Sequence, residues 1–141
     1  AKNITVGNNC KLNYPSALVL KEKSQIIKYK TNPKETPQLK ISKVSEIKGS
    51  IIYLGTTKNY KAQVLIDKGA KVIGEIYCNK NVELLGSVYG SVFTTGFVAS
   101  QSGSSYQNHI YNGTINVDNL VEEYVGFPFE NSKKGIAKWL Y

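Results

Sequence analysis

Four short segments of the chain repeat one pattern, in which an apolar residue lies two positions before and two positions after a central glycine. They span residues 47–51, 72–76, 88–92 and 111–115. Alternation with a period of two is typical of half-buried strands, and a glycine recurring within it marks a bend or a close approach between backbones. One such coil cannot bury its own apolar edge, so the repeat predicts stacked coils, a β-solenoid.

Apolar pairs extend this register towards the N-terminal side of each coil. They lie at residues 4 and 6, 39 and 41, 64 and 66, 82 and 84, and 97 and 99. Cys10, Ser45 and Ala70 fall at one shared corner that favours small side chains, so Cys10 is expected to be buried rather than reactive. Spacing leaves a disulfide with Cys78 open. The residues expected to point inward are Ile4, Val6, Leu12, Leu39, Ile41, Ile47, Ile51, Val64, Ile66, Val72, Ile76, Val82, Leu84, Val88, Val92 and Ile115.

The repeat predicts an all-β domain over residues 1–120, a β-solenoid of about five coils. Inserted loops are expected at residues 29–38, 55–61 and 101–108, where glycine, proline and polar residues interrupt the alternation. A strand-like run begins at Ile4, almost directly after a residue that is not methionine. We therefore expect Ala1 to mark a cut within a longer protein.

Residues 121–141 lack the repeat and are expected to form a C-terminal capping segment. Asn131 and Ser132 suit the start of a short helix, and Ile136, Trp139 and Leu140 would share one side of it. This pattern predicts a helical or extended lid over the open end of the stack, since terminal coils need protection from edge pairing. A helix that binds a membrane surface or a partner protein is the alternative.

The charge pattern is unusual because all 18 basic residues are lysine. Bidentate contacts with phosphate and guanine are made mostly by arginine, so we expect no nucleic-acid partner. Residues 1–80 hold 15 lysines and 5 acids, whereas residues 81–132 hold 5 acids and no lysine. Lysines that only solvate strand edges are one interpretation, and a face for an acidic polymer is the other. The candidate basic face comprises Lys40, Lys43, Lys48, Lys61, Lys68 and Lys71.

The same register points large apolar side chains outward from neighbouring coils. Soluble proteins rarely leave such a flank bare. Residues 118–141 or an inserted loop are expected to cover it, or it contacts a protein or a glycan, which aromatic ladders suit. The candidate interaction surface comprises Ile52, Ile73, Tyr77, Tyr89 and Phe93.

Residues suited to catalysis are scattered. His109, the one histidine, lies in a polar loop without a carboxylate or a cysteine close to it in sequence, which predicts a surface position. The aspartates Asp67 and Asp118 are too isolated for a calcium loop. We therefore expect no enzyme, no cofactor and no metal site, with a polysaccharide lyase as the weaker alternative. No apolar run is long enough for a transmembrane segment.

The glycine repeat, together with the corner in Asp67-Lys68-Gly69-Ala70-Lys71-Val72, resembles the bactofilins, most clearly over residues 39–94. The resemblance implies a right-handed β-helix that assembles without nucleotide and organises the bacterial cytoskeleton or envelope. The expected function is a non-catalytic structural or assembly module that presents rigid faces to itself or to an envelope partner. A binding module for acidic glycan or cell-wall polymer is the alternative. The expected location is the bacterial cell envelope or outside the cytoplasm, with the cytoplasmic face of the membrane as the other option.

Overall fold

The computed structural model describes residues 2–22, 38–56, 60–120, 122, 124, 126 and 127. These residues form nine strands and no helix. The expected lid helix after residue 130 lies outside them, as does most of the expected loop at 29–38. The strands are β1 (Asn3–Val6), β2 (Lys11–Lys21), β3 (Gln38–Ile41), β4 (Glu46–Leu54), β5 (Val64–Ile66), β6 (Lys71–Leu84), β7 (Ser87–Gln101), β8 (Ser104–Gln107) and β9 (Thr114–Asn116).

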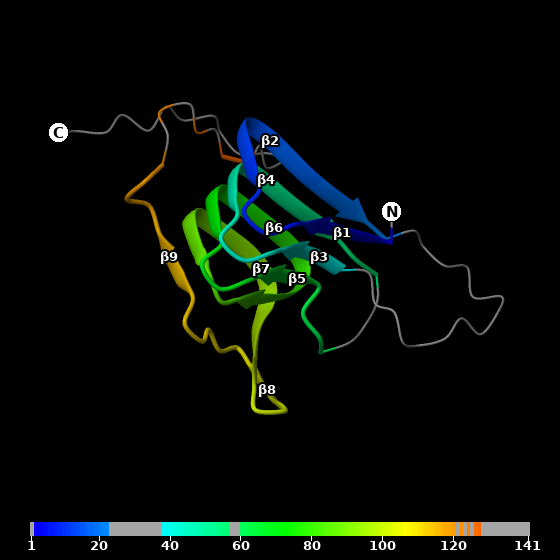
Figure 1. The fold of residues 1–141 in the computed structure, drawn as a ribbon. Helices are drawn as coiled ribbons and strands as arrows, with labels where there is room; N and C mark the ends of the chain where they lie inside the picture. Colours follow the sequence, from blue (N-terminus) through cyan, green and yellow to red (C-terminus); the bar gives the residue numbers. More distant parts are fainter. Residues whose placement is uncertain are drawn as a thin grey trace.

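Almost all of these strands pair in parallel, in a sheet that winds round on itself (Figure 1). In one stack β1, β3 and β5 lie side by side and continue onto the end of β6. In the other stack β2, β4 and the first parts of β6 and β7 follow one another. The long strands β6 and β7 run from one stack into the other and nearly close the sheet. The predicted all-β solenoid is confirmed at this level.

The predicted inward register is correct in the middle coils. Ile47 pairs with Val72, which pairs with Val88, so these side chains form one column inside the stack. Ile4, Val6, Leu12 and Val92 are partly buried and pack against the core from the outer coils. The fully buried members of the predicted set are Leu39, Ile41, Ile47, Ile51, Val64, Ile66, Val72, Ile76, Val82, Leu84 and Val88.

Three of the repeated glycines, Gly49, Gly74 and Gly90, lie directly over one another. All three have φ near +145°, a conformation that L side chains rarely adopt. A Cβ on Gly74 or Gly90 would lie 2.0 Å from the carbonyl oxygen of the glycine in the preceding coil. The glycines therefore allow both the unusual backbone conformation and the close approach of neighbouring coils.

A second column of small residues forms the predicted corner. The N–H groups of Glu46, Lys71 and Ser87 donate to the carbonyl oxygens of Cys10, Ser45 and Ala70, at 2.9, 2.8 and 2.9 Å. Burial of Cys10 was a wrong expectation, since its side chain is exposed. Its corner belongs to the first coil and has a described neighbour, Ser45, on one side only, whereas Ser45 and Ala70 are covered by coils on both sides.

The last coil departs from the predicted alignment. Gly113 lies over Gly86 and not over Gly90, because Thr114 pairs with Ser87 and its N–H donates to the Gly86 carbonyl oxygen at 3.0 Å. Ile115 was expected to be buried, yet it is 40% exposed. It pairs with Val88 on one side, and no described strand lies on its other side.

The expected loop at 101–108 is largely a hairpin. Strand β8 pairs antiparallel with the end of β7, and Gln101 lies opposite Ser104. Ser102 and Gly103 between them both have positive φ, as a two-residue type I′ turn requires. The hairpin projects from the stack at the bottom of Figure 1.

Candidate functional site

The predicted aromatic surface is brought together by the strand register. Ile52, Tyr77 and Phe93 form one outward column, and the exposed Val19 of β2 extends it by one coil. Ile73 and Tyr89 pair with each other in a neighbouring column. The repeat pattern did not identify Val19, because the repeat is interrupted at residues 13–15.

Part of the C-terminal segment packs on this surface. The ring of Phe127 lies edge-on to Tyr77 and Phe93, with centroids 6.3 and 6.2 Å apart. The Glu75 carboxylate accepts hydrogen bonds from the Tyr124 hydroxyl and the Phe127 N–H. Burial and the hydrogen bond to Glu75 raise the pKa of Tyr124. Phe127 therefore covers part of this surface, and Tyr124 is held beside it through Glu75.

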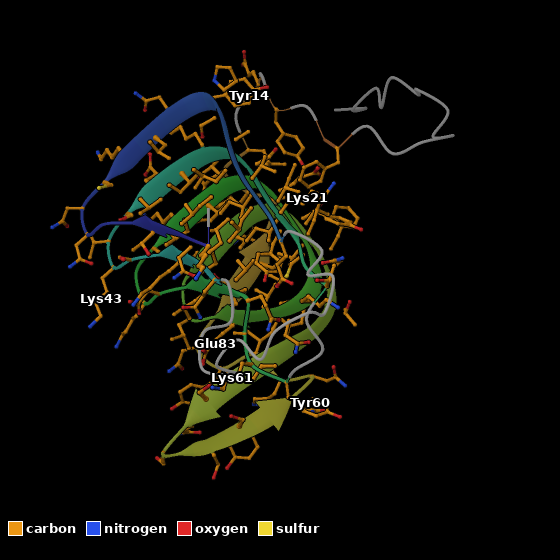
Figure 2. All side chains as sticks on the ribbon, turned by 90° about the vertical axis from the view of Figure 1, so that its right-hand side faces the viewer. Tyr14, Lys21, Lys43, Tyr60, Lys61 and Glu83 are labelled. Carbon is orange, nitrogen blue, oxygen red and sulfur yellow. The ribbon has the colours of Figure 1, made fainter. Side chains whose placement is uncertain are left out.

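The six candidate lysines differ in their surroundings. Lys40 lies 3.9 Å from an Asp67 carboxylate oxygen, and Lys48 lies 3.8 Å from a Glu46 oxygen, so both are in ion pairs. Figure 2 shows Lys43 and Lys61 well apart on the ribbon. Lys43 and Lys68 occupy equivalent turns of successive coils, and Lys71 begins β6.

His109 is exposed after β8, as predicted, and its ring lies 6.5 Å from that of Tyr106. No group of three metal-binding side chains comes together among the described residues. None of the described segments forms a helix long and apolar enough to cross a membrane.

A groove that the sequence did not predict lies between residues 60–81 and the β7–β8 hairpin. Its volume is about 480 Å³. Figure 2 shows Tyr60 beside the hairpin, at one wall of the groove. The lining consists mainly of aromatic, amide and hydroxyl side chains: Tyr60, Asn79, Lys80, Asn81, Thr95, Gly96, Phe97, Val98, Gln107 and Asn108.

A second hollow of about 450 Å³ adjoins this groove, because Asn79 and Thr95 line both. Its other walls include Tyr77 and Phe93 of the aromatic surface. Asn79 is fixed in place: its side-chain oxygen accepts a hydrogen bond from the Gly55 N–H at 2.7 Å, and its side-chain NH₂ donates to the Gly55 oxygen at 3.1 Å. The two hollows therefore form one elongated depression with a rigid middle.

A buried polar cluster at the ends of β2 and β4 was also not predicted from the sequence. Tyr53 is fully buried and donates a hydrogen bond to Glu22, whose other carboxylate oxygen accepts from the Thr56 N–H at 2.8 Å. Burial, followed by the hydrogen bond to Glu22, raises the pKa of Tyr53. The cluster fastens the end of β2 to the end of β4.

The two cysteines differ in accessibility, and both thiols are free. Burial raises the pKa of Cys78 to about 11. Since the thiolate is the reactive form, we expect an aromatic disulfide reagent at pH 8 to modify Cys10 rapidly and Cys78 only after denaturation. Cys10→Ser should abolish the rapid phase and Cys78→Ser should leave it intact. Equal rates for both thiols in the folded chain would contradict this structure.

No protein-family model, curated protein or solved structure matches the chain.

Proposed function

We propose that the chain is a non-catalytic assembly module that pairs with a second copy of itself through its first coil, β1 and β2. The observation that carries the proposal is the edge of this coil that no described strand covers. Among the described strands, β1 has a neighbour only in β3, and β2 only in β4. Their other edges present backbone N–H and C=O groups that a further strand can pair with.

The interior of the first coil is also incompletely covered. Ile4 and Val6 of β1 and Leu12 and Leu18 of β2 are half-buried, although their equivalents one coil further on are fully buried. Removing apolar surface from water is worth roughly 25 cal/mol per Å². A second copy that covered these four side chains would add this hydrophobic stabilisation and new backbone hydrogen bonds between strands.

The geometry of β2 favours a two-fold pair over a filament. Ser16 occupies the column of Gly49 but lacks its positive φ, and the register shifts between Leu12 and Ser16. The backbone path on which later coils stack is therefore interrupted at this edge. At the other end, the β7–β8 hairpin projects from the stack (Figure 1). A filament of copies stacked in the same direction would need two different ends that fit each other. A two-fold dimer brings the same end of both copies together.

The handedness, the number of coils, the family likeness and the location are also part of the proposal. We propose a right-handed β-helix of about five coils, since parallel crossover connections are almost always right-handed. The glycine column supports a bactofilin-like module of the bacterial cell envelope, with the cytoplasmic face of the membrane as the alternative location. An envelope protein is the other candidate partner, and the two-fold contact favours self-pairing.

The proposal predicts a reversible dimer in sedimentation equilibrium, with a mass that rises from monomer to dimer over about two decades of concentration. Ile4→Lys and Leu18→Lys place a charge inside the open edge and should hold the chain monomeric. Val117→Lys is the matched control, because Val117 is 59% exposed and lies beyond β9. Circular dichroism confirms that each variant folds. A wild-type chain that remains monomeric, or that forms long filaments, contradicts the proposal.

A further inference from the structure

The elongated depression beside the β7–β8 hairpin has the composition of a site for a ligand with both apolar faces and hydroxyl groups. Tyr60 is 76% exposed and forms one wall, while Phe97 lies half-buried in the lining. Aromatic rings of this kind offer a flat apolar surface with a polar tip at tyrosine. Most pockets for small ligands combine such rings with a few placed polar groups.

Amide side chains converge on the floor of the groove at Gly96. A Cβ at this position would lie 3.2 Å from the Asn108 amide oxygen and 3.3 Å from that of Asn81. Asn108 is held in place by its backbone, which has a φ of 55° and donates a hydrogen bond to the Phe97 oxygen at 2.7 Å. The two carboxamide oxygens therefore lie closely over Gly96, and a side chain at this position would have to displace them.

Carboxamides both donate and accept hydrogen bonds, as sugar hydroxyls do. Gln107 and Thr95 add further groups of this type to the same lining. Lys80 is the one formally charged residue among those described around the two hollows. This composition complements a neutral polyhydroxylated chain better than an acidic polymer, which would need several cations.

A peptide strand is less well suited to the groove. Extended peptides gain affinity by pairing with an open strand edge. The hairpin segment that lines the groove is already paired, since Val98 lies opposite Gln107 within the β7–β8 ladder. On its other side β7 pairs with β6, for example Phe97 with Val82. Side chains rather than backbone groups are therefore offered to the ligand.

We infer that this depression binds a neutral oligosaccharide, with Tyr60 against a sugar ring face and Asn81, Gln107 and Asn108 on the hydroxyls. The adjoining hollow extends the site past Thr95 towards Tyr77 and Phe93, which makes room for more than one sugar unit. The site involves β6, β7 and β8 and leaves the open edge of β1 and β2 free. Binding of a glycan and pairing of two copies are thus independent properties.

Isothermal titration calorimetry of the whole chain with cello-oligosaccharides and chito-oligosaccharides tests the inference. We expect binding to at least one series, weakened about tenfold or more by Tyr60→Ala, which corresponds to about 1.4 kcal/mol. Tyr106→Ala is the matched control, because Tyr106 is 52% exposed on the same hairpin but does not line the groove. Its affinity should equal that of the wild type.

Gly96→Val supplies a second variant, whose side chain would displace the two neighbouring carboxamides and should also weaken binding. Circular dichroism of each variant separates loss of the site from loss of the fold. Failure of both neutral series to bind overturns the inference. So does salt-sensitive binding restricted to polygalacturonate, preferential binding of an extended peptide, or an equal loss of affinity in Tyr60→Ala and Tyr106→Ala.

Discussion

Gly74→Ala should destabilise the chain by at least about 3 kcal/mol and leave much of it unfolded at room temperature. Gly74 has a φ of +146°, and its new Cβ would lie 2.0 Å from the Gly49 carbonyl oxygen. Two coils would have to separate at this point, because a backbone oxygen cannot swing aside as a flexible side chain does. Urea denaturation followed by circular dichroism measures the loss of unfolding free energy.

Gly7→Ala is the matched control for this effect. Gly7 lies in the first turn, has no positive φ, and its new Cβ would meet only the Cys10 Sγ, at an ordinary 3.7 Å. We expect its unfolding free energy to stay within about 1 kcal/mol of the wild type. If Gly74→Ala were equally mild, the close stacking of glycine on glycine would be wrong.

Tyr53→Phe should lower the unfolding free energy by about 1–3 kcal/mol, the usual cost of removing one partner of a buried hydrogen bond. The ring stays in place, so the packing of this fully buried side chain is preserved. The change removes the hydroxyl that donates to Glu22 at the junction of β2 and β4. Tyr89→Phe is the control, since Tyr89 lies on the outward face of β7. Equal stability of Tyr53→Phe and the wild type would show that this contact contributes little.

The same tyrosine predicts a loss of stability in alkali. Its pKa is raised in the folded chain, so above the ordinary value of 10.0 the unfolded chain releases a proton that the folded chain retains. Stability is therefore complete below about pH 10 and falls as the pH rises further, by up to about 1.4 kcal/mol per pH unit for this group. The fall should be shallower in Tyr53→Phe. Thermal melts between neutral and alkaline pH measure the difference.

The middle of the fold was predictable because each coil carries a glycine, a small corner residue and an apolar alternation in fixed order. The last coil was misaligned for a reason visible in the sequence. Gly86-Ser87-Val88 and Gly90-Ser91-Val92 are both good matches to Gly113-Thr114-Ile115. In the structure, Thr114 pairs with Ser87 and its N–H donates to the Gly86 oxygen, which distinguishes the two matches.

The groove was not predictable by the same route. Its lining comes from segments that do not occupy equivalent positions of the repeat: residues 60, 79–81, 95–98, 107 and 108. Strand β8 of the hairpin consists of serine, tyrosine and glutamine, and this composition indicated a loop. The Tyr53–Glu22 contact was missed because the repeat lapses at residues 13–15, so the end of β2 had no assigned register.

The central claim is that the open edge of the first coil is an assembly surface. Amide hydrogen exchange, measured residue by residue at low and high protein concentration, tests it most directly. At high concentration, amides of β1 and of the Ala17–Lys21 part of β2 should gain protection from exchange. Amides of the β7–β8 hairpin should exchange at the same rate at both concentrations. Unchanged exchange along β1 and β2 at every concentration would contradict it.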